Sequence, residues 1–252
     1  MVATIFKDLS QTNTPFYRDI DFILNRIKTG TSKTLVEKIR LEKDKKVRNE
    51  LKSQLTAICF SGKFTRRADT AISEHSGLIC LDFDNYDTIE QLNEDLKAIN
   101  KDKYTFASFI SPSGNGFKLL VKIPTEIENH KLYFDSLADY YNNSHFDITS
   151  KNISRICFES YDPNLFINKK ALTWTTKKEF QSYSYIDKAP SLKLTNENEI
   201  INRLYKWFLK EHSFEKGQRN ANLFILASAF SDYGISKLEA SRFCYQFQAD
   251  DF

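Results

Sequence analysis

Two aspartates separated by one residue, Asp82 and Asp84, end the apolar stretch Leu-Ile-Cys-Leu-Asp-Phe-Asp at residues 78–84. Because side chains alternate along a strand, both carboxylates would project from one face, about 7 Å apart at the backbone. Two like charges at this spacing need a counter-charge, and a divalent cation with oxygen ligands supplies it. Phosphoryl-transfer enzymes hold one or two metal ions in this way. The alternative is that Asp84 only opens a turn and caps the helix that follows.

A turn of small residues, Ser-Pro-Ser-Gly-Asn-Gly-Phe-Lys, joins two predicted strands. Glycines let backbone amides come close to an anion, and hydroxyl groups add donors. A lysine directly after such a turn suits a triphosphate, so the pattern predicts a phosphate-binding loop made of Ser111, Ser113, Gly114, Gly116 and Lys118. Ordinary hairpin chemistry explains the same residues. The stretch is not a Walker motif, because no Gly-Lys-Ser/Thr opens a helix.

A third carboxylate and an arginine follow later in the chain. Asp147 comes after a predicted helix and is a candidate third metal ligand. Arg155 begins a predicted strand, and its planar guanidinium suits phosphate oxygens. The alternatives are that Asp147 caps a turn and that Arg155 pairs with Glu159 or Asp162.

Four further residues are candidates for contact with a template or an incoming nucleotide. They are the basic cluster Lys63, Arg66 and Arg67, and His75 just before the aspartate strand. A basic cluster can meet phosphates, whereas a lone histidine is more often structural. The other basic stretch, residues 33–52, is predicted to be a solvated helix face.

Composition narrows the class of protein. The chain has 252 residues and 41% hydrophobic residues, enough for a large domain and a small one. A net charge of +3 does not by itself indicate nucleic acid. The cysteines lie in apolar runs without paired spacing, which predicts reduced thiols in a cytoplasmic protein. We find no signal peptide and no apolar run that would span a bilayer, so no membrane function is expected.

The elements that must position these residues follow from periodicity. Short apolar runs predict strands with two helices among them, the strands at 55–60, 77–83, 105–110, 117–123 and 154–158 and the helices at 88–99 and 129–141. Before them we predict a strand or arm through Asn13, a helix from Thr14 to Gly30, and one charged helix over 34–52. Hairpins mixed with crossovers predict an α+β domain whose sheet is mixed or antiparallel and flanked by helices, not a uniformly parallel one.

The last quarter of the chain has a different pattern. A polar stretch at 177–194 predicts a linker between a catalytic domain of residues 1–176 and a small all-α domain of residues 195–252. In the second domain, Ser236 and Glu239 have capping-box spacing and predict the start of a helix. The final residues close no element, so we expect the natural chain to be longer.

The order of these features is characteristic. An apolar strand with Asp-x-Asp, a Ser-x-Ser-Gly-x-Gly turn into a strand, and a later Asp together resemble the catalytic core of the archaeo-eukaryotic primase superfamily, which includes the primase-polymerases. The closest resemblance is to the VirE-type N-terminal domain, found in replication proteins of mobile elements and phages, often ahead of a helicase. It spans about residues 55–168 and is carried by the segments 62–67, 75–85, 111–118 and 152–163.

This resemblance implies a DNA-directed nucleotidyltransferase that makes primers on single-stranded DNA from nucleoside triphosphates. It implies that Asp82, Asp84 and Asp147 are catalytic ligands of Mg²⁺ or Mn²⁺, and that the small-residue turn holds the nucleotide's phosphates. The superfamily usually has a histidine at the position of Lys118. Lysine neutralises a phosphate as a point charge but does not reproduce a neutral imidazole donor.

The stretch around Arg219 and Asn220 resembles the small helical domain that follows such cores, where it is thought to handle template or primer, or to couple to a helicase. The alternative is that both residues only cap and pair within the helices. Three rival functions remain: a module that only grips single-stranded DNA or a nucleotide, a helicase adaptor, and a nicking nuclease. The nuclease would need closely spaced histidines, which the sequence lacks.

Overall fold

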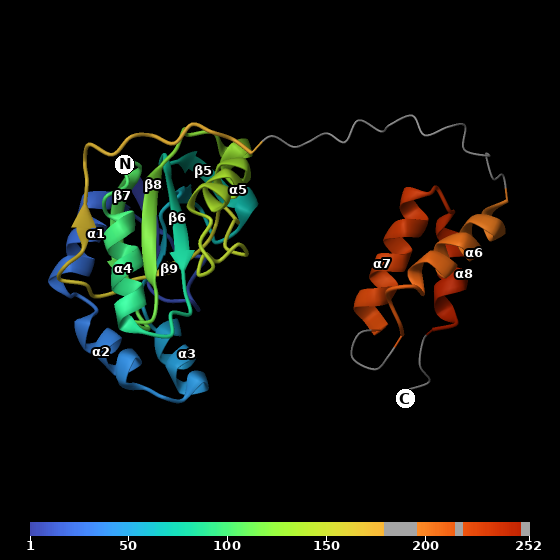
Figure 1. Ribbon diagram of the computed structural model, residues 1–252, viewed down its shortest axis with the longest axis horizontal. Helices are drawn as coiled ribbons and strands as arrows, with labels where there is room; N and C mark the ends of the chain where they lie inside the picture. Colours follow the sequence, from blue (N-terminus) through green and yellow to red (C-terminus); the bar gives the residue numbers. More distant parts are fainter. Residues whose placement is uncertain (179–195, 215–218, 248–252) are drawn as a thin grey trace. The chain divides into compact units, whose positions relative to one another are not determined.

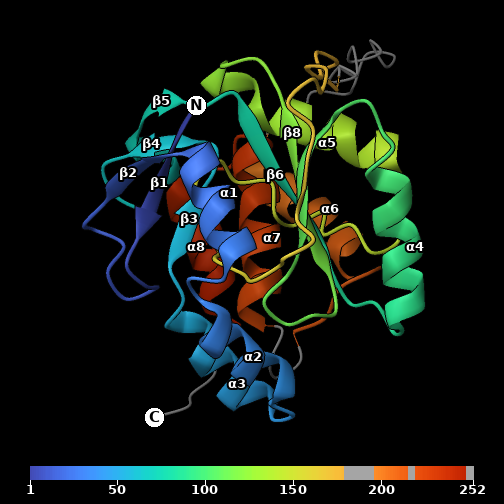
Figure 2. The same ribbon diagram turned by 90° about the vertical axis from the view of Figure 1, so that its left-hand side faces the viewer.

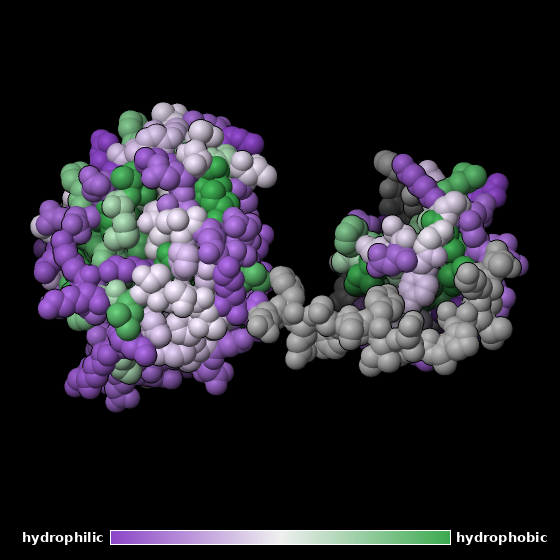
Figure 3. All heavy atoms as spheres, turned by 90° about the horizontal axis from the view of Figure 1, so that it is seen from above, coloured by the Kyte–Doolittle hydropathy of each residue, from purple (hydrophilic) through white to green (hydrophobic). Residues whose placement is uncertain are grey.

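The computed structural model describes residues 1–178, 196–214 and 219–247. The chain divides into two compact units, residues 1–181 and 182–252, which are described separately. The predicted linker at 177–194 lies almost entirely outside the described residues. No helix in the described ranges is both long enough and apolar enough to cross a membrane. Hydrophilic residues cover much of the face of each unit seen in Figure 3.

The first unit combines strands and helices. Its strands are β1 (Val2–Phe6), β2 (Phe16–Asp19), β3 (Ala57–Cys59), β4 (Gly62–Phe64), β5 (Ile72–His75), β6 (Leu78–Phe83), β7 (Thr105–Ile110), β8 (Phe117–Lys122), β9 (Cys157–Phe158) and β10 (Phe166–Ile167). Its helices are α1 (Ile20–Thr29), α2 (Lys33–Leu41), α3 (Lys45–Ser53), α4 (Ile89–Ile99) and α5 (His130–Tyr141), with short 3₁₀ turns at Asp69–Ala71 and Ile127–Asn129.

These strands form two four-stranded sheets and one hairpin. The first sheet has the order β2-β1-β3-β9, the second has the order β10-β7-β8-β6, and β4 pairs with β5. All pairings between these strands are antiparallel. Helices flank the sheets, with α2 and α3 beyond one end of them (Figures 1 and 2). The predicted α+β class with an antiparallel sheet is confirmed.

Side-chain alternation along β6 gives the second sheet two different faces. Ile79, Leu81 and Phe83 pack in one cluster with residues of α4 and α5, the helices that cover this face. Leu78 points the other way, into a core shared with α1 and the first sheet, and Cys80 packs against that core. By the same alternation Asp82 lies on the face of Leu78 and Cys80, at the end of the strand, where the covering core stops.

Several predicted elements are confirmed. The strands predicted at 77–83, 105–110 and 117–123 are β6, β7 and β8, and the two helices predicted among the strands are α4 and α5. The strands predicted at 55–60 and 154–158 are shorter, reduced to β3 and β9. The β4–β5 hairpin and β10 were not predicted, because they are short and irregular in pattern.

The helix predicted from Thr14 begins later, at Ile20. Phe16 fits the helical spacing, but residues 16–19 form edge strand β2 and pair in register with β1. The ladder hydrogen bonds satisfy this backbone, and Phe16 stays 47% exposed instead of joining the helical core. Gly30 ends the helix as predicted, in the left-handed conformation at φ 89°.

The single charged helix predicted over 34–52 is two helices, α2 and α3. The break comes at Asp44, whose carboxylate accepts hydrogen bonds from the backbone N–H groups of Lys46 and Val47, at 2.7 and 3.0 Å. This is an N-cap, and it offers the chain a better local alternative than a continuous helix.

The described part of the second unit is helical: α6 (Glu197–Phe208), α7 (Arg219–Asp232) and α8 (Lys237–Tyr245). Its core gathers Ile201, Leu204, Phe208, Leu226 and Phe230. The hydroxyl of Ser236 accepts a hydrogen bond from the Glu239 N–H at 3.4 Å, which confirms the predicted helix start.

Candidate active-site cleft

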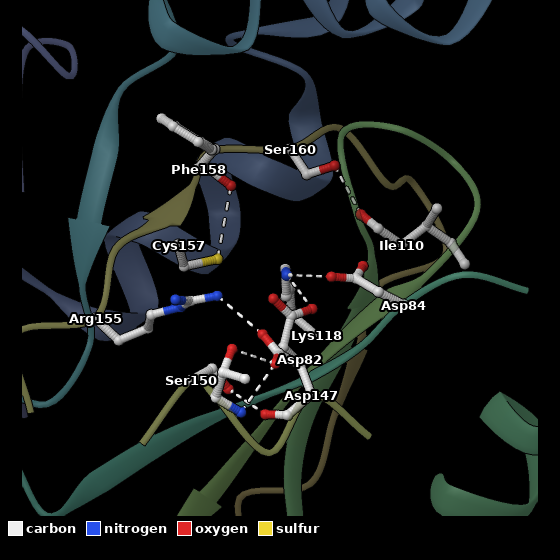
Figure 4. Close-up of polar contacts among 11 residues, drawn as sticks. Asp82, Asp84, Ile110, Lys118, Asp147, Ser150, Arg155, Cys157, Phe158 and Ser160 are labelled. Carbon is white, nitrogen blue, oxygen red and sulfur yellow. Dashed lines mark hydrogen bonds and ion pairs between the residues drawn. The ribbon is translucent and has the colours of Figure 1, made fainter. Parts of the chain in front are cut away.

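The aspartate pair meets a lysine at the end of β6. Asp82 is 7% exposed, and Lys118 of β8 is its direct cross-strand partner. The Lys118 ammonium contacts the Asp82 carboxylate and lies 4.0 Å from Oδ2 of Asp84 (Figure 4). The ammonium therefore lies between the two carboxylates.

Burial and charge act against each other in this group. Burial raises the pKa of Asp82 to about 6, although the Lys118 ammonium works against this rise. Burial also opposes the charge on Lys118, yet the carboxylates of Asp82 and Asp84 raise its pKa above the usual value. The group is thus an ion pair between Asp82 and Lys118 beside the more exposed carboxylate of Asp84.

The small-residue turn packs directly against this pair. The Ser111 N–H donates to the Gly116 carbonyl at 2.8 Å, and the Gly114 N–H donates to the Ser111 carbonyl at 3.0 Å. Gly114 has φ +80°, a conformation that favours glycine. A Cβ on Gly116 would lie 2.3 Å from the Phe83 carbonyl oxygen and 2.6 Å from Oδ1 of Asp84. Only glycine allows the turn to approach the aspartates this closely.

One hydroxyl of the turn is buried and unpaired. Ser111 is 2% exposed, lines the cleft described below, and its Oγ has no hydrogen-bond partner among the described residues. Buried polar atoms are normally hydrogen-bonded, so an orphan of this kind calls for an explanation. A ligand oxygen in the cleft would supply one.

Asp147 lies next to Asp82, although far from it in sequence. Its N–H donates to the Asp82 carbonyl at 2.8 Å. Its carboxylate accepts from the N–H and hydroxyl of Thr149, at 3.0 and 2.6 Å. It also accepts from Arg155 Nη2 at 3.0 Å (Figure 4). Arg155 thus pairs with Asp147 and not with Glu159 or Asp162, the two alternatives. The ion pair with Arg155 therefore engages one oxygen of Asp147, the predicted third metal ligand.

These residues line a cleft of about 390 Å³. Its wall combines the aspartate pair and the turn with side chains from four other regions: Leu9, Asn49, Lys52, Arg67, Asp82, Asp84, Ser111, Pro112, Ser113, Lys118, Arg155, Ile156 and Phe158. Four of these side chains are cations and two are carboxylates, so the lining carries a net charge of +2. Such a cleft attracts a polyanion.

Two cleft-side residues were missed because they lie in the basic stretch expected to be solvated. Lys52 of α3 lines the cleft, and burial lowers its pKa while the Asp84 carboxylate opposes this. Arg40 of α2 donates through Nη2 to the carbonyls of Ser111 and Tyr161, at 3.2 and 2.9 Å. For these two residues the solvated-face prediction was wrong. The available signal for Arg40 was its helical spacing from the apolar Val36, which is buried.

The other basic residues predicted to contact template or nucleotide lie in different parts of the protein. Arg67 lines the cleft. Lys63 does not: it binds Glu74 at 2.6 Å on the β4–β5 hairpin and lines a separate groove. Arg66 is exposed and is not part of the cleft wall. Arg219 begins α7 in the second unit, so its predicted role stays a prediction.

His75 has a structural environment. It is 5% exposed, its Nε2 lies 3.0 Å from Nδ1 of His130, and its Nδ1 accepts from the Gly77 N–H at 3.0 Å. Burial lowers the pKa of His75 to about 4. The fold therefore pairs two histidines that are distant in sequence. Neither lines the cleft, and no group of three or more His, Cys, Asp or Glu side chains in the described ranges is placed to hold a metal.

Comparison with known proteins adds two likenesses. A family model described as "BT4734-like, N-terminal domain" matches residues 50–166, a range that holds every cleft residue except Leu9 and Asn49. The crystal structure of the primase RepB′ aligns with 97% of this chain and 80% of its own at 13% identity, with a TM-score of 0.33. That likeness is weak. No curated protein matches the sequence significantly. The chain is thus similar, over the segment that builds the cleft, to the BT4734-like N-terminal domain.

Proposed function

We propose that the cleft binds a nucleoside triphosphate and transfers its nucleotide to a 3′-hydroxyl, making primers on single-stranded DNA. One observation carries the proposal. An aspartate pair that holds the ammonium of Lys118 lies against a turn whose Ser111 hydroxyl is buried and has no hydrogen-bond partner among the described residues. A cation site and an anion site in one cleft are what a nucleotidyl transfer requires.

The phosphates would bind along the turn. Ser111 and Ser113 offer hydroxyl groups, Gly114 and Gly116 let the backbone approach, and Lys118 and Arg155 supply positive charge at the cleft. The planar guanidinium of Arg155 suits phosphate oxygens, and it would neutralise charge that develops on them during transfer. The resemblance of the turn to that of primases supports the same assignment.

The aspartate pair fits Mg²⁺ or Mn²⁺. Mg²⁺ commonly takes one or two protein carboxylates and completes its shell with water and substrate phosphates. Asp82 and Asp84 meet this need, and the Lys118 ammonium between them stands in for a cation. A bound ion would lower the charge of the triphosphate and activate the hydroxyl. Asp147 is the proposed third ligand, because its backbone lies beside Asp82. Its carboxylate would have to leave Arg155 and Thr149 to join the aspartate pair.

Primer synthesis tests the proposal. The protein is incubated with a single-stranded template, labelled ribonucleotides or deoxyribonucleotides, and Mn²⁺ or Mg²⁺, and the products are resolved by length. We expect the double variant Asp82→Asn/Asp84→Asn to lose product formation. Asp139→Asn, which changes an exposed carboxylate paired with Lys178, is the matched control. Full activity of the double variant would reject the assignment.

A second function is favoured by one feature of the same cleft. Lys118 already neutralises the aspartates and Arg155 already binds Asp147, so the cleft could hold a nucleotide or single-stranded DNA without catalysis. The same incubation separates the two functions. Binding of nucleotide or template without any extended product would favour a module that binds but does not catalyse. Replication of a mobile element or phage, and coupling to a helicase through the helical unit, are the context that the sequence resemblance suggests.

A further inference from the structure

Lys118 occupies the position that a metal ion would need. Its side chain is 12% exposed, and its ammonium contacts the Asp82 carboxylate and lies 4.0 Å from Asp84 Oδ2. The contact is built into the sheet, because Lys118 and Asp82 face each other directly in the β6–β8 register. Figure 4 shows the ammonium pointing at both aspartates.

An ammonium and a divalent cation cannot share this gap, since they would repel each other and compete for the same oxygens. We propose that Lys118 and the divalent cation compete for Asp82 and Asp84, so that the cation binds tightly only when a nucleotide's phosphates take up the Lys118 ammonium. This inference rests on the proposed function, and it adds that metal and nucleotide bind cooperatively through one side chain.

The neighbouring turn offers the ammonium its second partner. Lys118 stands two residues after Gly116, at the start of the strand that leaves the turn, and lysine carries its charge on a flexible four-carbon stem. A phosphate bound near Ser111 would therefore be within its reach. Leaving Asp82 without such a partner would strand a buried ammonium, which is strongly unfavourable.

The charge of the whole cleft favours the same order. With a net charge of +2, the lining repels a free divalent cation, whereas a metal-bound triphosphate is a net anion. Coupling of this kind is reciprocal: the metal must strengthen nucleotide binding by the same factor by which the nucleotide strengthens metal binding.

Metal binding without nucleotide is the sharpest test. Free and bound Mn²⁺ are measured by electron paramagnetic resonance during titration of the whole chain. We expect Lys118→Met to bind Mn²⁺ at least about tenfold more tightly than the wild type, because two carboxylates lose their counter-charge. Lys52→Met is the matched control: it also removes one cation from the cleft wall, but not one in contact with Asp82, and should change the affinity less than about threefold.

A gain no larger in Lys118→Met than in Lys52→Met overturns the competition. Should Lys118→Met fail to fold, the wild type still gives an answer. Acylation of Lys118 by a lysine-directed reagent, followed by mass spectrometry, should rise several-fold with Mn²⁺ at saturating concentration. Unchanged labelling of Lys118 would refute the displacement.

Cooperative binding of metal and nucleotide is tested with a non-hydrolysable triphosphate analogue. Its affinity for the wild type should rise at least about tenfold from EDTA to Mn²⁺, and this ratio should shrink in Lys118→Met. An equal ratio in both proteins overturns the inference even if primers are made. Cooperative binding in a protein that makes no primer instead rejects the proposed function and leaves the competition in place.

Discussion

Gly116→Ala is the substitution whose consequence the structure defines most closely. The added Cβ would lie 2.3 Å from the Phe83 carbonyl oxygen, 2.6 Å from Asp84 Oδ1 and 3.1 Å from Asp84 Cα. Real Cβ atoms essentially never come within 3.0 Å of another heavy atom, so the end of β6 and the turn must separate by at least 0.7 Å. Backbone cannot rotate aside as a side chain can. The separation would therefore displace Asp84, one of the two residues of the proposed cation site.

The expected size follows from this displacement. A misplacement of about 1 Å can cost about 10²-fold in rate, so we expect primer synthesis to fall by about 30-fold to 100-fold. The overpacking itself should lower the free energy of unfolding by about 1–3 kcal/mol. Labelled-nucleotide incorporation at saturating template measures the rate, and urea denaturation measures the stability.

Gly77→Ala is the matched control for strain without loss of geometry at the cleft. Gly77 has φ +79°, and its Cβ would lie 3.3 Å from the Ile123 carbonyl oxygen, just before the opposite end of β6. We expect backbone strain to lower the free energy of unfolding by a similar amount, about 1–3 kcal/mol. The folded molecules of this variant should make primers at the wild-type rate. If Gly116→Ala keeps activity within twofold of the wild type, or loses no more than Gly77→Ala, the reasoning about the close approach is refuted.

Three other predictions follow from buried polar groups. Arg26→Leu should lower the free energy of unfolding by about 3–5 kcal/mol in urea denaturation, because Glu159 is 1% exposed and binds Arg26 through both oxygens, at 2.6 and 3.0 Å. Arg40→Met should weaken nucleotide-analogue binding by about tenfold in calorimetry, because the turn loses the donor to its first carbonyl. Burial lowers the pKa of His75 from 6.5 to about 4 and that of His130 to about 3, so below pH 6.5 the unfolded chain binds protons that the folded chain does not. The free energy of unfolding should therefore keep its full value above pH 6.5 and fall as the pH drops towards 4.

Each of these three has a contrasting variant. The double variant Arg26→Leu/Glu159→Leu should recover most of the lost stability, since no buried charge is left unpaired; no recovery would contradict the ion-pair reasoning. Lys33→Met removes an exposed cation of the same helix as Arg40 and should leave analogue affinity unchanged. His130→Asn should make the fall in stability between pH 6.5 and 4 shallower, by up to about 1.4 kcal/mol per pH unit. An unaltered slope would show that the histidine pair does not cause it.

Local chemistry determined much of this protein from sequence alone. Alternation predicts that Asp82 and Asp84 share one side, and the Lys118 ammonium lies near both, although β6 itself ends at Phe83. The glycines of the turn indicate a close backbone approach. The helix start at Ser236 depends on a hydrogen bond across only three residues. In each case the interacting groups are a few residues apart, so periodicity and residue type contain the answer.

Tertiary structure decided what those residues meet. Lys118 faces Asp82 because of the register between β6 and β8, and a slip of one residue would turn its side chain to the opposite face. The same holds for Arg40 against the turn, for Asp147 beside Asp82 and for His75 against His130. These pairs are joined by chain closures over 55 to 71 residues. Which partners such closures bring together depends on the packing of the whole core, and no local pattern in the sequence records it.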